Sequence, residues 1–89
     1  MTTTEVADQI ETFVRNQFRV AVGDTRFSRT QPLFDLGYID SVGVVELLAF
    51  LDDRFGIQLP DDVLMSDEFA TIHGMATIVC RFGSGQPPR

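Results

Sequence analysis

The sequence predicts an all-α fold, a small bundle of four helices with a long loop between helices 1 and 2 and a short third helix. Apolar residues recur at helical intervals in three segments, near residues 4–20, 41–55 and 72–82. Turn-forming residues separate these segments, and neither a convincing strand pattern nor an internal repeat occurs between them. The 89 residues suffice for one small domain with a modest core.

The first helix is predicted over about residues 4–20. Thr2 and Glu5 have the spacing of a capping box, in which each side chain binds the backbone of the other residue. Gly23 and Asp24 mark the end of the helical pattern. The expected buried stripe consists of Val6, Ile10, Phe13, Val14 and Phe18.

Residues 23–40 form a long connection that contains Gly23, Pro32 and Gly37 and has no sustained period. Connections of this length are uncommon in compact domains and are often functional. We expect three apolar side chains to hold the connection on the core: Leu33, Phe34 and Leu36.

The second helix is predicted over about residues 41–55 and ends at Gly56, which suits a left-handed helix terminus. One side should face the core, with Leu47, Leu48, Leu51 and Phe55, and with Val44 at its edge. A second apolar strip, beyond what one core needs, consists of Val42, Val45 and Ala49.

The remaining chain contains a short helix and a last helix. Pro60 suits the start of the short helix, at about 61–66, and Thr71 is a candidate N-cap for the last helix, which runs to about residue 82. The predicted core side of the last helix consists of Ile72, Met75, Ala76, Val79 and Phe82. We therefore expect one domain over residues 1–82 and a disordered tail over 83–89, which is rich in Gly and Pro.

The charge is concentrated in one part of the chain. Residues 40–68 hold eight acids and one base, a net charge of −7, whereas the whole chain has a net charge of −6. This sign excludes a nucleic-acid partner and favours basic protein surfaces. The sequence shows neither a signal peptide nor a membrane span, which predicts a cytoplasmic protein without membrane insertion.

The candidate chemistries centre on Ser41, which follows Asp40 at the start of the second helix. A catalytic serine needs a base and an oxyanion hole, but the only histidine, His73, lies at the start of the last helix and is expected on the surface. The acids lack metal-site spacing, and the single cysteine, Cys80, has no activating neighbour. An Asp-Ser pair alone is also compatible with an ordinary helix start. The preceding Gly37 turn, the second apolar strip and its acidic border favour a displayed serine beside a docking surface.

Three motifs carry a family resemblance: Gly37-Tyr38-Ile39-Asp40-Ser41-Val42, Val45-Glu46-Leu47-Leu48 and Phe55-Gly56-Ile57-Gln58-Leu59-Pro60. With these motifs the chain resembles the acyl carrier protein family over about residues 5–82, including the long loop and the Thr71-Ile72 start of the last helix.

The resemblance implies the acyl-carrier four-helix bundle, with no catalytic activity of its own. It implies that Ser41, flanked by Asp40, carries 4′-phosphopantetheine through a phosphodiester. The arm would end in a thiol that holds a small acyl or aminoacyl group as a thioester. The implied partners of this monomer are a phosphopantetheinyl transferase, an acyl- or aminoacyl-activating ligase and downstream biosynthetic enzymes, which would contact Val42, Val45, Glu46 and Ala49.

The chain also departs from the usual fatty-acid carriers. Val42 replaces a commoner leucine, Gly43 replaces an acid, and Arg54 interrupts an acidic helix end. Gly43 and the segment 66–69 make the chain similar to the D-alanyl carriers and to free-standing carriers of secondary metabolism. Two alternatives stay open: a non-enzymatic interaction module that does not use the prosthetic group, and an esterase that would turn over a model ester.

Overall fold

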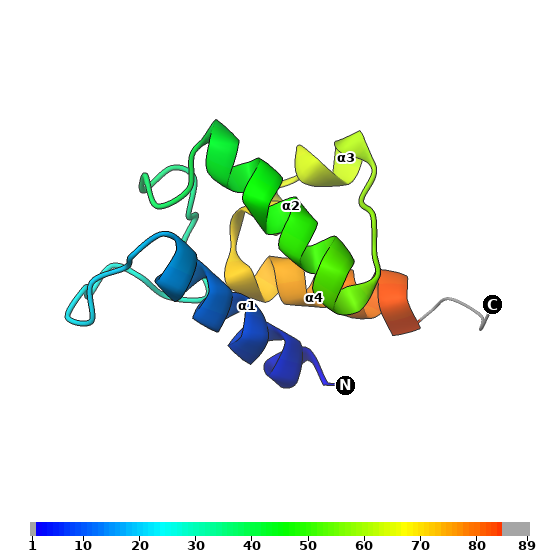
Figure 1. Ribbon diagram of the computed structural model, residues 1–89, viewed down its shortest axis with the longest axis horizontal. Coiled ribbons are helices and arrows are strands. Elements are labelled where there is room, and N and C mark those ends of the chain that lie inside the picture. The colour runs from blue at the N-terminus through cyan, green and yellow to red at the C-terminus, as the bar shows by residue number, and fades with distance from the viewer. Residues whose placement is uncertain (1, 85–89) are drawn as a thin grey trace.

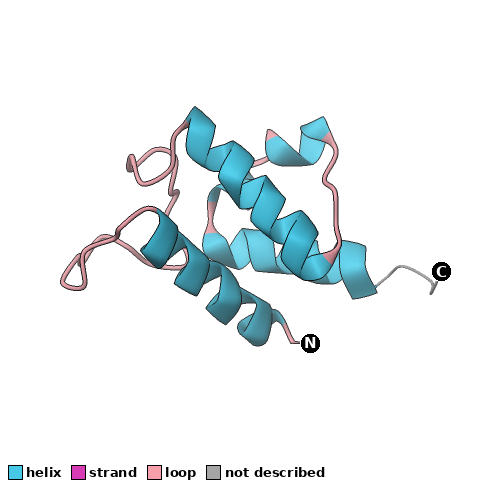
Figure 2. Cartoon of the chain, in the orientation of Figure 1, coloured by secondary structure: helices cyan, strands magenta, loops and turns pink. Residues whose placement is uncertain are grey.

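The computed structural model describes residues 2–84, which form helices joined by loops and contain no strand (Figures 1 and 2). Four α-helices follow in the order α1 (Thr3–Gln17), α2 (Ser41–Phe55), α3 (Asp61–Leu64) and α4 (Ile72–Ser84), with a 3₁₀ helix, η1 (Asp67–Ala70), between α3 and α4. The predicted all-α fold, with a long first loop and a short third helix, is confirmed.

The ends of α1 show which local signals the sequence carries. The capping box at Thr2 and Glu5 is present, because the Glu5 N–H donates to Thr2 Oγ1 and the Thr2 N–H donates to the Glu5 carboxylate. The predicted C-terminal end near residue 20 is wrong, since α1 stops at Gln17 and Arg19 adopts a left-handed φ of 53°. The apolar pattern does not show where the helix ends, because Phe18 still packs on the core although it lies at the C-cap, outside the helix.

The core is built mainly where α1 packs against α4 (Figure 1). The predicted stripes of both helices are buried at their centres, whereas Phe13, Phe18 and Phe82 are half-buried. Ile78, which the predicted stripe of the last helix omits, is also fully buried. The difference arises because α4 packs against α1, α2 and η1 at once, and its buried arc is wider than one stripe.

The long loop is fixed to α4 and η1 at several points. The Leu33 N–H donates to the Ala70 carbonyl (2.9 Å), and the His73 N–H donates to the Arg29 carbonyl (2.8 Å). Phe34 stacks on Phe69 with ring centroids 6.0 Å apart. Leu33 is buried as predicted, and Phe34 and Leu36 are half-buried. Two further anchors, which the sequence analysis did not include, are Phe27 and Ile39.

A cluster of charged side chains ties the same loop to α1. The Arg29 guanidinium pairs with Asp8 and with Glu11 (Nε to Oε1, 2.7 Å), and Arg15 pairs with Glu11 from the preceding turn (2.9 Å). The Arg15 guanidinium also lies over the Phe27 ring, 4.5 Å from its centroid. The two arginines lower the pKa of Glu11, Arg29 most strongly, through hydrogen bonds to its carboxylate.

The segment after Pro60 differs from the single helix predicted at 61–66. Pro60 does begin α3, but the helix ends at Leu64, and η1 follows as a separate turn. The Ser66 hydroxyl donates to the Val63 carbonyl (2.6 Å) at this break, which shows how a serine competes with continued helix. Thr71 then caps α4 as predicted, accepting a hydrogen bond from the Gly74 N–H (2.9 Å).

The last helix continues two residues beyond the predicted end at residue 82, and its backbone therefore includes the start of the expected tail. Residues 85–89 of that tail lie outside the described residues. The domain boundary at residue 82 and the disorder of residues 83–89 stay predictions.

Candidate functional site: the N-terminal end of α2

Ser41 is the first residue of α2, and its side chain is exposed. Asp40 caps the helix, because its Oδ1 accepts the Gly43 N–H (2.8 Å) while its carbonyl accepts the Val44 N–H (2.9 Å). The cap fixes the direction in which the helix begins and leaves the neighbouring serine hydroxyl in solvent. The predicted capping role of Asp40 is confirmed by this geometry.

The approach to Ser41 is held in place by the loop that precedes it. Gly37 adopts a φ of 84°, which side-chain-bearing residues rarely reach, and so provides the predicted turn. The Tyr38 hydroxyl donates to Asp24 Oδ2 (2.6 Å), and Ile39 is only 3% exposed. The hydrogen bond from Tyr38, helped by the Arg26 N–H, lowers the pKa of Asp24, whose carboxylate therefore stays charged while it closes the loop.

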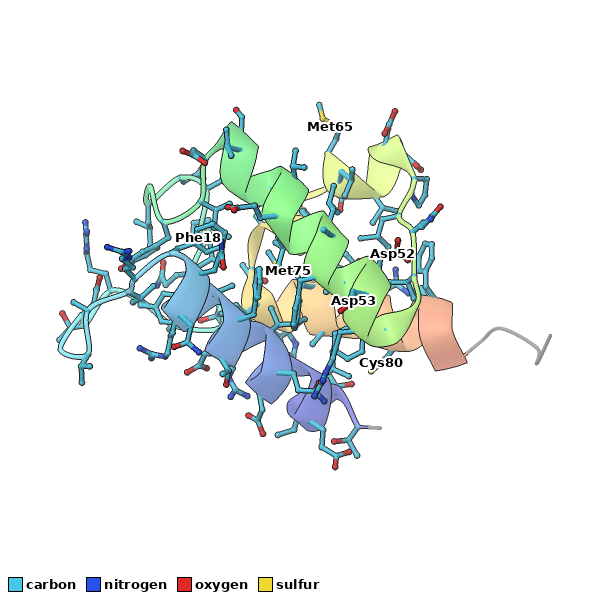
Figure 3. The ribbon with its side chains drawn as sticks, in the orientation of Figure 1. Phe18, Asp52, Asp53, Met65, Met75 and Cys80 are labelled. Atoms are coloured by element: carbon cyan, nitrogen blue, oxygen red, sulfur yellow. The ribbon has the colours of Figure 1, made fainter. Side chains whose placement is uncertain are left out.

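Gly43 explains how the start of α2 packs on α1. A Cβ at Gly43 would lie 2.7 Å from Phe18 Cε1, closer than real Cβ contacts, and 3.0 Å from Ile39 Cγ2, which is a tight contact. The missing side chain therefore makes room for the Phe18 ring, which Figure 3 labels at the C-terminal end of α1. The glycine that stands in place of an acid thus has a packing reason in this chain.

The six residues proposed for attachment and partner contact are all exposed along α2: Asp40, Ser41, Val42, Val45, Glu46 and Ala49. Val42 is 68% exposed and Val45 is 66% exposed, so the second apolar strip is absent from the core, as its helical phase predicts. Glu46 accepts a hydrogen bond from Gln17 of α1 (2.9 Å), a contact that the sequence did not indicate.

Met65 is a surface residue that sequence reasoning missed. It is 85% exposed at the end of α3, which lies on the same side of the molecule as the start of α2, the upper side in Figures 1 and 3. A methionine is a flexible apolar contact suited to docking surfaces. One feature of the sequence could have predicted this exposure: Met65 follows a helix that is too short to have both of its sides buried.

The electrostatics at Ser41 suit a phosphodiester. The N–H groups of Ser41 and Val42 lie in the first turn of α2, where a helix has no intrahelical acceptor for them. These groups and the helix dipole favour negative charge at this position. The exposed hydroxyl leaves room for a bulky substituent, so the residues present fit a phosphopantetheine group, which would supply a thiol at the end of a long arm.

The other candidate chemistries find little support in the described part of the chain. His73 is exposed at the start of α4, and its backbone is bound to the loop at Arg29. No group of three or more His, Cys, Asp or Glu residues among residues 2–84 could hold a metal ion. Cys80 is half-buried and accepts a hydrogen bond from Thr3 Oγ1 at 3.6 Å. None of the described helices is both long enough and apolar enough to cross a bilayer.

The capped helix, its exposed first serine and the neighbouring apolar face define a class of protein: a helical carrier module with an attachment point instead of a catalytic centre. Comparison with known proteins agrees with this class. Residues 8–79 match the family described as "Phosphopantetheine attachment site". The chain belongs to this family of phosphopantetheine-binding carrier proteins, which are non-catalytic, and a phosphopantetheine attachment site is present.

Individual relatives agree with the family. The D-alanyl carrier proteins of Streptococcus pyogenes serotype M5 (strain Manfredo) and serotype M1 are each 32% identical over 62 residues, covering 70% of this chain and 78% of theirs. A solved structure of KstB-PCP in its apo form is 34% identical, covers 99% of this chain and 94% of its own, and superposes with a TM-score of 0.65.

Proposed function

We propose that the protein carries a small acyl or aminoacyl group as a thioester on a 4′-phosphopantetheine arm attached to Ser41, and delivers it to biosynthetic enzymes. The observation that supports this proposal most directly is the exposed Ser41 hydroxyl at the capped N-terminus of α2. The similarity to D-alanyl carrier proteins favours an aminoacyl group. We further propose that the protein acts as a monomer in the cytoplasm.

The chain's own residues position Ser41 and the arm, and they do not themselves make or break bonds in the carried group. Asp40 directs the start of α2, and the first-turn N–H groups stabilise negative charge beside Ser41. The tether raises the effective concentration of the carried group at each partner's active site. The exposed face formed by Val42, Val45, Glu46 and Ala49, together with Met65, would contact the transferase, the activating ligase and the downstream enzymes in turn.

The test is covalent loading followed by intact-mass measurement. The protein is incubated with coenzyme A, Mg²⁺ and a broad-specificity phosphopantetheinyl transferase, and we expect the mass of one phosphopantetheinyl group to be added. Ser41→Ala should abolish the addition, whereas Ser28→Ala, which alters a loop serine, should not. Failure of wild type with several transferases, or a mass addition that survives Ser41→Ala, would refute the proposal and leave the interaction module as the better interpretation.

A further inference from the structure

The segment that precedes Ser41 is held from two sides within the long loop. On one side it closes a tight turn, in which the Tyr38 N–H donates to the Leu33 carbonyl (3.0 Å). On the other side the Tyr38 side chain reaches back to an earlier part of the same loop, at Asp24 and Phe27. In Figure 1 this loop occupies the left side of the molecule, between the C-terminal end of α1 and the start of α2.

The Asp24 carboxylate joins these two parts of the loop, because its two oxygens have different partners. Oδ1 accepts the backbone N–H groups of Arg26 (2.8 Å) and Phe27 (3.2 Å), which fixes the turn that carries Phe27. Oδ2 accepts the Tyr38 hydroxyl (2.6 Å), and we call this contact the Asp24–Tyr38 clamp. Hydrogen bonds to an ionised carboxylate are stronger than those between neutral groups. Loss of either side chain therefore separates the early part of the loop from the segment before Ser41.

The clamp is supported from α1 by a stack of side chains. The Tyr38 ring meets the Phe27 ring edge-on, with centroids 5.2 Å apart, and Phe27 is only 7% exposed. The Arg15 guanidinium lies over the Phe27 ring and is itself paired with Glu11 (2.9 Å). Edge-to-face rings and a cation over a ring both favour particular orientations. The last turn of α1 therefore restrains the approach to α2 through Tyr38.

The contacts at the start of α2 do not replace the clamp. Asp40 binds the Gly43 N–H inside the first turn of the helix, and the buried Ile39 side chain packs beside Gly43. Both contacts hold the segment to α2, whereas the clamp holds it to the early part of the loop. Gly37 lies between the tight turn and Ser41 with a φ of 84°, and glycine has more backbone conformations open to it than other residues. The clamp therefore selects one of the conformations available at this glycine.

We propose that Asp24 and Tyr38 are positioning residues for the loading of Ser41: they hold the preceding segment in the conformation that the phosphopantetheinyl transferase binds. The inference rests on the proposed function, because it concerns the loading reaction at that serine. Asp24 and Tyr38 act through the backbone that leads to Ser41 and do not contact the transferred group. In the reaction the Ser41 oxygen bonds to the phosphorus of the phosphopantetheinyl half of coenzyme A. The diphosphate P–O bond breaks, adenosine 3′,5′-bisphosphate leaves, and the hydroxyl proton is released.

The kinetic consequence follows from the fraction of carrier molecules whose segment is already in place. When the conformation that an enzyme binds is only partly populated, the apparent affinity falls by that fraction. In the bound complex the segment is in place in every variant, so the reaction step itself is unaffected. Loss of the clamp should therefore raise the KM of the transferase for the carrier and leave kcat almost unchanged.

The test is the steady-state rate of loading at varied carrier concentration, with coenzyme A, Mg²⁺ and a broad-specificity transferase. Tyr38→Phe removes only the hydroxyl and should raise KM about threefold, whereas Asp24→Ala also releases the turn at Phe27 and should raise it about fivefold. The variant with both changes should stay within about twofold of Asp24→Ala, because the hydroxyl has no acceptor left to bind. Asp24→Asn keeps an oxygen for the turn and a polar group for Tyr38, and should recover most of the wild-type KM.

The matched control is Thr2→Ala, which removes a capping hydrogen bond at the opposite end of α1. Thr2→Ala and Tyr38→Phe should each lower Tm by roughly 4–8 °C, since a cap and a hydrogen bond contribute similarly to stability. Only Tyr38→Phe should raise KM, and Thr2→Ala should change it by less than about twofold. Amide hydrogen exchange at Gly37 should also become faster in Tyr38→Phe and not in Thr2→Ala. This pair of variants separates positioning from a general loss of stability.

Several results would overturn the inference: an unchanged KM in Tyr38→Phe and Asp24→Ala, an equal rise in Thr2→Ala, or a fall in kcat without a change in KM. If circular dichroism shows that Asp24→Ala is partly unfolded at the assay temperature, Tyr38→Phe and Asp24→Asn provide the comparison. Normal loading of wild type with unchanged KM in the variants would refute the positioning role alone. Failure to load wild type with any transferase would instead refute the proposed function, and with it the role in loading.

Discussion

The close approach of α4 to η1 at Gly74 predicts that Gly74→Ala destabilises the protein. A Cβ at this position would lie 1.7 Å from the Glu68 carbonyl oxygen and 2.7 Å from its carbonyl carbon. The closest comfortable carbon–oxygen contact is about 3.3 Å, so one backbone must move by roughly 1.5 Å. The atoms in conflict belong to the η1 backbone, and no flexible side chain can relieve the contact by rotating.

The magnitude follows from two opposing effects. Alanine favours the helix over glycine by up to about 1 kcal/mol, whereas overpacking costs about 1–3 kcal/mol and occasionally more. The displaced backbone would also weaken the Thr71 cap on α4 and the hydrogen bond from Leu33 to Ala70, each worth about 1 kcal/mol. We expect a net loss of about 2 kcal/mol in the free energy of unfolding, which lowers Tm by roughly 8–16 °C in a domain of this size.

Thermal and urea unfolding followed by circular dichroism measure this loss. The matched control is Gly23→Ala, because a Cβ at Gly23 meets nothing within 4 Å, and its stability should stay within about 0.5 kcal/mol of wild type. A Gly74→Ala protein as stable as wild type would refute the reasoning. Because η1 anchors the loop that leads to Ser41, we also expect slower phosphopantetheine transfer to Gly74→Ala at temperatures where it stays folded.

Four further predictions follow from the structure. Asp40→Ala should lower the free energy of unfolding by about 1 kcal/mol through loss of the cap on α2, measured by urea unfolding. Leu47→Ala should leave a cavity in the core, since Leu47 is fully buried, and cost about 2–5 kcal/mol in the same assay. Glu46→Arg should weaken binding to partner enzymes, measured by calorimetry, and change stability by less than about 1 kcal/mol, because Glu46 is exposed and its hydrogen bond with Gln17 lies at the surface. The pKa values of Glu11 and Asp24 lie below their ordinary values of 4.5 and 3.8, so both carboxylates stabilise the fold above those values, and Tm should fall as the pH drops from about 5 to 3.

Each of these predictions has its own control. Asp40→Asn should retain most of the stability, because asparagine also caps helices well. Val45→Ala, which truncates an exposed valine, should leave stability almost unchanged where Leu47→Ala does not. Unfolding of Glu46→Arg would show that Glu46 is structural, and a Glu11→Gln protein whose Tm follows pH as steeply as wild type would contradict the role given to Glu11.

The sequence predicted those features of the fold that depend on local chemistry. The capping residues Thr2, Asp40 and Thr71 all bind the backbone N–H groups that their positions indicate. Gly56 ends α2 with a φ of 68° as expected. These predictions succeeded because a cap or a left-handed glycine is determined by residues only a few positions apart.

Features that depend on packing between distant segments were not predictable in the same way. The burial of Ile78 depends on the number of elements around α4, and the need for glycine at position 43 depends on Phe18 of α1. For the site, the exposure of Val42 and Val45 followed from helical phase, whereas the hydrogen bond between Gln17 and Glu46 required knowing that α1 and α2 lie side by side.

The hydrogen bonds from the loop to η1 and α4 have a consequence for the order in which parts of the protein fold. The segment that leads to Ser41 is bound near Leu33 and Arg29 to residues from the C-terminal third of the chain. Contacts between sequence-distant segments form only after the loops between them have closed. An unfinished or truncated polypeptide therefore contains the serine but not the surface that presents it. We therefore expect the loop before Ser41 to become ordered only once η1 and α4 have formed.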